Sequence, residues 1–278
     1  MSAVGAAPVA EGRKRDAQLI AALGVAVAIG LAALVSLVWT PYAAGPAGLG
    51  PQLADPGASH WLGTDGSGRD VLSALMSATL TTLLASLFAT LVGLWGGVTA
   101  GVALSSLGQR GGDATEVSLA GIAAPALLIA AVLAGLESPG LVTIILAVAA
   151  PGAVLVALST RAMAGRLQAL DFVAAARIAG LTPMAAAQRH VMPQLLPRLA
   201  ALGLRLLAAA VLIEMGVSYG GLGLAAPAQS LGQMLHDAQG LLQVKPLLAV
   251  APGLVGLAFA MALEIAAGRL AGGPDGPA

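Results

Sequence analysis

The residues of this chain that are suited to chemistry are few and far apart. Residues 216–220 form a Gly-x-Ser-x-Gly pattern, which marks the nucleophile elbow of many hydrolases and makes Ser218 a candidate nucleophile. In those enzymes the serine stands on a strand-to-helix turn, whereas here it follows a long apolar segment. None of the histidines, His60, His190 and His236, is near it in sequence. Residues 216–220 therefore have two interpretations, the nucleophile of an intramembrane hydrolase or a helix end that is loosened by small residues. We expect the helix end.

Other chemistries lack the residues that they require. The chain has no cysteine, which excludes disulfides, thiolate metal sites and cysteine nucleophiles. No His-Glu-x-x-His zinc motif is present, and solvated loop histidines are a simpler interpretation of His60 and His236 than a shared metal site. Neither Lys14 nor Lys245 follows a glycine, so the chain has no P-loop for ATP. We expect it to bind no cofactor and not to be an enzyme.

The composition predicts a membrane protein. Only 9% of the 278 residues are charged, against about 25% in an ordinary soluble domain. Apolar residues make up 58%, mean hydropathy is +0.91, and 13 basic residues balance 13 acidic ones. These values exclude a typical soluble enzyme, a nucleic-acid binder with a basic patch and a disordered chain. Aromatic residues are only 3%, so the apolar content is mainly that of small and aliphatic side chains, which allow helices to pack closely.

Apolar segments of about 20 residues, enough to cross a hydrocarbon core of about 30 Å as helices, occur six times. They cover residues 18–39, 79–104, 114–136, 141–160, 199–217 and 247–268. The predicted fold class is therefore all-α, a polytopic membrane protein with six transmembrane helices. The basic residues before the first segment would also suit a cleaved signal peptide. That segment is longer than the roughly 7–15 residues of a signal core, so we expect it to be retained as a span.

Glycines are spaced four residues apart in the second apolar segment, at Gly93, Gly97 and Gly101. This spacing places a groove on one helix face, where a second helix can approach closely. In a chain with 37 glycines the same spacing can also arise by chance.

The basic residues predict the orientation of the chain. Ten of the 13 lie on the side of the termini and of the second and fourth loops, whereas only Arg69 and Lys245 lie on the other side. Cytoplasmic loops carry such an excess of Lys and Arg. The predicted cytoplasmic parts are the N-terminal tail 1–17, the loop 161–198 and the C-terminal tail 269–278. The polar loop 40–78 is then extracytoplasmic.

The loop at 161–198 is too structured in pattern to be a simple linker. Apolar residues at 167, 170, 173 and 174 favour an amphipathic helix, Gly180 begins a turn, and Thr182 and Pro183 suit the start of a second helix. Two short helices at the cytoplasmic surface would suit docking to a soluble partner. The alternative is a solvated loop that only carries positive charge.

Three segments together carry a resemblance to a known family. Residues 60–72 resemble a His-Trp-Leu-Gly-Thr-Asp-x-x-Gly-Arg-Asp signature, and residues 214–224 are similar to a Glu-x-x-Leu-Ser-Phe-Leu-Gly-Leu-Gly segment. Residues 171–197 look like the cytoplasmic "EAA" loop of bacterial ABC importer permeases. The signature residues are His60, Trp61, Gly63, Thr64, Asp65, Gly68, Arg69 and Asp70. Those of the loop are Asp171, Phe172, Ala174, Ala175, Ala176, Arg177, Gly180, Arg189, His190 and Pro193.

The three matches cover about residues 55–268 and resemble the C-type permease subunits of bacterial dipeptide, oligopeptide and nickel ABC importers. The resemblance implies a type I ABC importer permease fold over residues 79–268, in the bacterial inner membrane. It also implies a homologous B-type permease subunit, two ABC ATPase subunits that use ATP and Mg, and an extracytoplasmic substrate-binding protein. The solute would be a peptide or a similar small solute, nickel or a metal chelate included. In such importers the loop is a coupling helix that docks on an ATPase.

Some residues depart from the family pattern. Ala174 stands where the family usually has Glu, which either weakens ATPase coupling or is compensated by Asp171. Arg205 stands in a span that is usually apolar, and it is about 13.5 Å along the helix from Glu214, too far for a direct pair. Arg205 and Glu214 are candidate pathway residues, although snorkelling would also explain the arginine. The alternative is a stand-alone secondary transporter, which would need ionisable residues clustered at the middle of the membrane. Arg205, Glu214 and Glu264 are the candidates, and they are few.

Overall fold

The computed structural model describes residues 7–43, 50–106, 119–136, 140–168, 192–224 and 228–271. These ranges are almost entirely helical and contain no strand, apart from one isolated bridge between Thr64 and Asp70. The long helices are α1 (Ala7–Val35), α2 (Val71–Ser106), α3 (Leu119–Leu136), α4 (Leu141–Gln168), α7 (Met192–Tyr219) and α9 (Leu247–Ala271). Between α7 and α9 lie the short helix α8 (Leu231–Ala238) and the 3-10 helix η2 (Gln239–Leu241).

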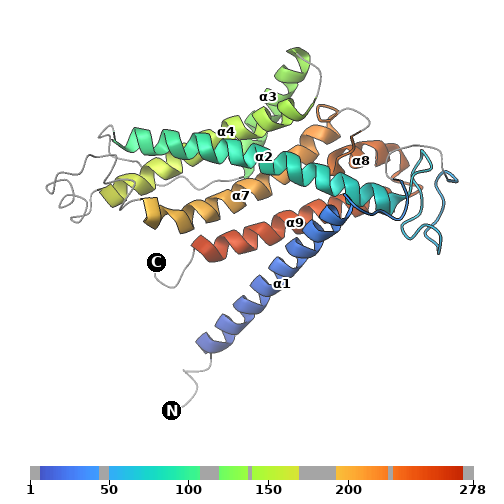
Figure 1. Ribbon diagram of the computed structural model, residues 1–278, viewed down its shortest axis with the longest axis horizontal. Coiled ribbons are helices and arrows are strands. Elements are labelled where there is room, and N and C mark those ends of the chain that lie inside the picture. Colours follow the sequence, from blue (N-terminus) through green and yellow to red (C-terminus); the bar gives the residue numbers. More distant parts are fainter. Residues whose placement is uncertain are drawn as a thin grey trace.

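Helices α2, α4, α7 and α9 run along the length of the molecule, and α1 diverges from α9 toward the N-terminus (Figure 1). Residues 50–70 and 228–246, which we call the cap, lie together at one end of this bundle. The C-terminal end of α4 and the N-terminal end of α7 lie at the opposite end (Figure 1). The all-α prediction is therefore confirmed for the described residues.

Five of the helices are long and apolar enough to cross a membrane: residues 17–35, 71–105, 141–165, 195–219 and 247–271. They correspond to five of the six predicted spans. The span predicted at 114–136 falls on α3, whose described apolar portion, Pro125–Leu136, is shorter than the others. Large apolar side chains remain exposed on the outer faces of the bundle, among them Phe88, Trp95 and Leu128, as expected for surfaces that face lipid.

Several helices extend beyond the boundaries drawn on hydropathy alone. Helix α2 begins at Val71 rather than at residue 79, because the side chain of Asp70 accepts a hydrogen bond from the Ser73 backbone N–H at 2.9 Å and so caps the helix. Helix α4 continues to Gln168 and α7 begins at Met192, so both extend into the loop predicted at 161–198.

The glycines of α2 form the predicted groove. A Cβ added to Gly97 would lie 2.5 Å from Cβ of Val156, and one added to Gly101 would lie 2.6 Å from the carbonyl oxygen of Ala157. Both neighbours belong to α4, so the backbone of α2 approaches α4 closely along this face. Larger side chains, such as Ile144 and Leu206, fill the core among α2, α3, α4 and α7.

Candidate functional sites in the cap and the helix bundle

The signature segment of the cap folds around the carboxylate of Asp65. Its Oδ1 accepts hydrogen bonds from the backbone N–H groups of Ser67, at 2.8 Å, and Arg69, at 2.9 Å. Its Oδ2 accepts a hydrogen bond from Nε of Arg69 at 2.7 Å. Gly63 and Gly68 have φ angles of 76° and 75°, in the left-handed region that favours glycine. This explains why both glycines belong to the motif.

Asp70 and Thr64 close the same loop from the other side. Oδ1 of Asp70 lies 2.9 Å from Nδ1 of His60, and its Oδ2 accepts from the hydroxyl of Ser73 at 2.8 Å. The buried Thr64 hydroxyl donates to the carbonyl of Pro51 at 2.5 Å. The structure therefore brings the predicted signature residues together in one hydrogen-bonded unit. Trp61 is the exception, since it is 70% exposed.

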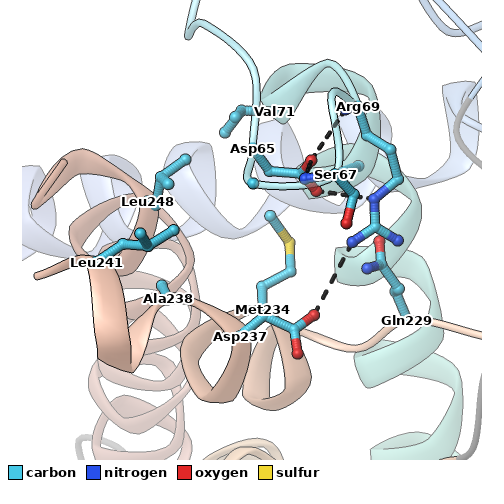
Figure 2. Close-up of a pocket in the computed structure, with 12 residues that line it drawn as sticks. Asp65, Ser67, Arg69, Val71, Gln229, Met234, Asp237, Ala238, Leu241 and Leu248 are labelled. Atoms are coloured by element: carbon cyan, nitrogen blue, oxygen red, sulfur yellow. Dashed lines mark hydrogen bonds and ion pairs between the residues drawn. The ribbon is translucent and has the colours of Figure 1, made fainter. Parts of the chain in front are cut away.

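A pocket of about 290 Å³ lies between this loop and α8 (Figure 2). We call it the cap pocket. Its polar lining residues are Asp65, Ser67, Arg69, Gln229 and Asp237, and its apolar ones include Val71, Met234, Leu241 and Leu248. Nη2 of Arg69 lies 3.9 Å from Oδ2 of Asp237. With its amide oxygen turned toward Arg69, Gln229 accepts from Nη1 and Nη2 at 2.6 and 2.7 Å. Arg69 thus joins the signature loop to α8.

Helix α8 lies between the segments 199–217 and 247–268, which were predicted as spans. The hydroxyl of Ser230 accepts from the backbone N–H of Gln233 at 3.3 Å and caps the helix. The backbone N–H of Leu231 donates to the Thr82 hydroxyl of α2 at 3.0 Å. An ion pair between Lys245 and Asp55 joins the two halves of the cap.

Glu214 is fully buried in the upper part of α7. The Ser218 hydroxyl donates a hydrogen bond to its Oε1 at 2.6 Å. The hydroxyls of Thr82 and Ser230 also face the carboxyl group, although Oε2 has no hydrogen-bond partner among the described residues. The group therefore connects α7 with α2 and with the start of α8.

Ser218 does not have the surroundings of a hydrolase nucleophile in the part of the chain that the structure describes. It is 3% exposed, and its hydroxyl donates to Glu214 rather than to a histidine. His236, on α8, instead contacts the carbonyl of Tyr219 at 2.7 Å through Nδ1. Helix α7 ends at Tyr219, and Gly221 follows with a φ of 75°. The predicted helix end with small residues is confirmed.

Arg205 meets an acidic residue on another helix. Its Nε lies 3.8 Å from Oε1 of Glu264, across the contact between α7 and α9. The two side chains are 28% and 55% exposed and line a groove of about 160 Å³ whose other walls are apolar. The spacing of Arg205 and Glu214 predicted that they do not pair, and the structure agrees, because Arg205 pairs with Glu264.

Most of the predicted coupling-loop residues lie outside the described residues. These are Asp171, Phe172, Ala174, Ala175, Ala176, Arg177, Gly180, Arg189 and His190. Pro193 lies in the first turn of α7. Among the described residues, no group of three or more His, Cys, Asp or Glu side chains is arranged to hold a metal ion.

Comparison with known proteins decides the family. No family model matches the chain. The chain is 30% identical over 245 residues to the nickel transport system permease protein NikC of Escherichia coli, with 88% of each chain covered. The chain belongs to the family of ABC importer permease subunits. A putative peptide permease protein of Brucella suis is 30% identical over 210 residues, with 75% of this chain and 69% of the relative covered.

The glutathione transport system permease protein GsiD of Pectobacterium atrosepticum is 27% identical over 201 residues, with 72% of this chain and 66% of the relative covered. The family membership and the apolar helices identify this permease as a multi-pass membrane protein. The resemblance on the three motifs is confirmed at the level of the family.

Several residues of the cap and bundle were not found from the sequence. Gln229 and Asp237 line the cap pocket, and Ser230 is the N-cap residue of α8. Thr82 connects α8 to α2. None of them stands in a recognisable motif. Their role depends on contacts between residues that are far apart in the chain, such as the 149 positions that separate Thr82 from Leu231.

Proposed function

We propose that the permease passes a peptide or a similar small solute, nickel or a metal chelate included, into the cytoplasm. A binding protein delivers the solute, and partner subunits supply the energy from ATP. The main support is the 30% identity over 88% of both chains with a nickel permease, together with the peptide and glutathione permeases that cover most of the same residues. The absence of a P-loop from the sequence agrees with ATP hydrolysis on another chain.

In the proposed orientation the cap is extracytoplasmic and both termini are cytoplasmic. Ten of the 13 basic residues then face the cytoplasm. The ends of α4 and α7 that flank residues 169–191 lie at the end of the bundle away from the cap (Figure 1). A coupling loop at 161–198 would therefore meet the ATPases on one side while the cap meets the binding protein on the other.

The proposed partners follow from this arrangement. They are a homologous B-type permease subunit, two ABC ATPase subunits that bind ATP and Mg, and an extracytoplasmic substrate-binding protein. The tails 1–17 and 269–278 lie on the cytoplasmic side, the permease domain covers residues 79–268, and no nucleic acid takes part. Gly180 provides the turn of the coupling loop, and Ala174 replaces the glutamate expected there.

We place the Arg205–Glu264 pair at the solute pathway or at its border with the second permease. Glu264 is 55% exposed, and the other charged residue of α9 is Arg269 in the last turn. A charged side chain at this depth is costly against lipid, and such residues face a water-filled cavity or a protein partner. The pair therefore marks the side of α7 and α9 that is turned away from lipid.

The proposal is tested by expressing the chain with its neighbouring genes and purifying it through a tag on this subunit. We expect an ATPase subunit to co-purify. We also expect uptake of either a labelled dipeptide or Ni²⁺ into proteoliposomes to require ATP and the binding protein. Uptake that is driven by a proton or sodium gradient without ATP would instead support the stand-alone transporter. Purification without any ATPase would overturn the coupling proposal.

A substitution in the coupling loop tests its role in uptake independently of membrane insertion. Gly180→Val is expected to abolish uptake while membrane insertion is retained, because a β-branched residue resists the turn that glycine allows. The control is Gly24→Val in α1, where an added Cβ meets nothing within 4 Å. Normal uptake by the Gly180 variant would contradict the proposed turn.

A further inference from the structure

We propose that the cap pocket binds one lysine or arginine side chain of the substrate-binding protein. The inference rests on the proposed function, because it takes the cap as the surface that the binding protein meets. It goes further in naming the site of contact, the charge of the group that enters and the residue that receives it.

The cap carries an excess of negative charge. Its described residues include four acidic side chains, Asp55, Asp65, Asp70 and Asp237, and two basic ones, Arg69 and Lys245. This is the opposite of the excess of basic residues in the rest of the chain. Complementary charge across an interface speeds association and fixes the register of the two partners. A surface that docks on the cap should therefore present basic side chains.

Three of the four carboxylates are already occupied. Asp55 pairs with Lys245, Asp70 is bound by His60 and Ser73, and Asp65 accepts from Arg69 and from loop amides.

Asp237 differs from the other three. It is half exposed, and the atom of Arg69 that approaches it, Nη2, stays 3.9 Å away. The guanidinium of Arg69 is held more closely by Asp65 and Gln229. Asp237 is therefore the carboxylate of the pocket that keeps the capacity to bind a further cation.

The shape of the pocket fits a side chain with an apolar stem. In Figure 2 Leu241, Leu248 and Ala238 lie on one side, and Arg69 and Gln229 lie on the other. Lysine and arginine side chains pack their methylene groups against apolar surface while the charged end reaches a polar group. A stem along the leucines with its cation at Asp237 matches this division.

The pocket is large enough for one long side chain. Its volume of about 290 Å³ also lies at the lower end of the range of small-molecule sites, which is about 300–1,000 Å³. The same chemistry could come from the amino group of a peptide solute, so the experiment must separate the two sources.

The test uses the complete importer in proteoliposomes, with the binding protein added at increasing concentration and ATP hydrolysis as the readout. We expect Asp237→Asn to raise the half-saturating concentration of binding protein about tenfold, and Asp237→Lys to raise it further, because like charges then meet. Raising the concentration of binding protein should overcome the loss. The matched control is Asp16→Asn in α1, an acidic residue outside the cap, which should stay within about twofold of the unmodified importer.

A reciprocal change identifies the source of the cation. Replacing surface lysines and arginines of the binding protein one at a time by glutamate should yield one variant that restores half-saturation with Asp237→Lys. Unchanged half-saturation in both Asp237 variants would overturn the inference. So would a defect that appears only with a cationic dipeptide as solute, or a lowered unfolding temperature of the Asp237→Asn importer that accounts for the loss. If the unmodified importer is not stimulated by any binding protein, the proposed function itself fails, and this inference fails with it.

Discussion

Glu214 and Glu264 lie on neighbouring helices of one bundle and have opposite surroundings. Glu214, on α7, is fully buried and bonded to a serine of its own helix. Glu264, on α9, is 55% exposed and faces the guanidinium of Arg205. Both follow long runs of apolar residues, although Glu214 also begins the motif at residues 214–224.

The difference lies in the environment of the two carboxyl groups and not in the residue type. A buried carboxyl group among hydroxyls holds elements together, here α7, α2 and the start of α8. A half-exposed carboxyl group beside a guanidinium remains accessible to solvent or to another subunit. Substitutions at the two sites should therefore affect different measurements.

The largest effect is expected on stability at the buried site. Glu214→Ala should lower the free energy of unfolding by about 3 kcal/mol, because it leaves a void and removes a partner from buried hydroxyls. Unfolding of the purified subunit in mixed micelles measures this. The matched change, Glu264→Ala, should cost less than about 1 kcal/mol, because that side chain is half exposed. Equal losses at the two sites would remove the distinction.

The second effect is expected on turnover at the exposed pair. Arg205→Ala should lower the turnover that the binding protein stimulates about tenfold, which corresponds to about 1.4 kcal/mol, with stability almost unchanged. The guanidinium no longer balances Glu264 on the surface that we place at the pathway. Arg205→Lys, which keeps the charge, is the control and should lose much less. Full turnover in the alanine variant would place the pair outside the working surface.

A charge exchange sharpens the same comparison. Arg205→Glu and Glu264→Arg should each impair turnover. The double variant should retain about threefold more turnover than the product of the fractions retained by the two single variants. That excess measures the coupling between the two side chains across α7 and α9. Strictly independent effects would mean that the separation of 3.8 Å has no functional meaning.

A smaller loss of stability than at Glu214 is expected at the serine beside it. Ser218→Ala removes one hydrogen bond and should cost about 1 kcal/mol of stability with turnover preserved. The unmodified permease should not be labelled by a serine-reactive phosphonate. Labelling that disappears in the alanine variant would revive the hydrolase interpretation.

The sequence predicted the features that depend on local pattern. Apolar segments located the long helices, the spacing of Gly97 and Gly101 located a helix contact, and small residues located the end of α7. These signals are read within one segment, because burial in lipid or against one neighbouring helix is enough to produce them.

Features that depend on distant contacts were not predicted. Helix α8 has only eight residues, and its start is fixed by Thr82 of another helix. The sequence showed that Arg205 cannot pair with Glu214, but it could not show that Glu264 would be the partner. The early start of α2 depends on Asp70, which belongs to a motif and at the same time caps the helix.

The glycine groove has a mechanical consequence. Helix α2 leaves the cap directly after Asp70, and α4 ends at Gln168, at the other end of the bundle. The absence of side chains at Gly97 and Gly101 brings the two helices into close contact. In the proposed function, a displacement of this end of α4 would therefore be passed to the cap through α2. The two helices would act as one stiff unit between the proposed ATPase side and the side where the solute arrives.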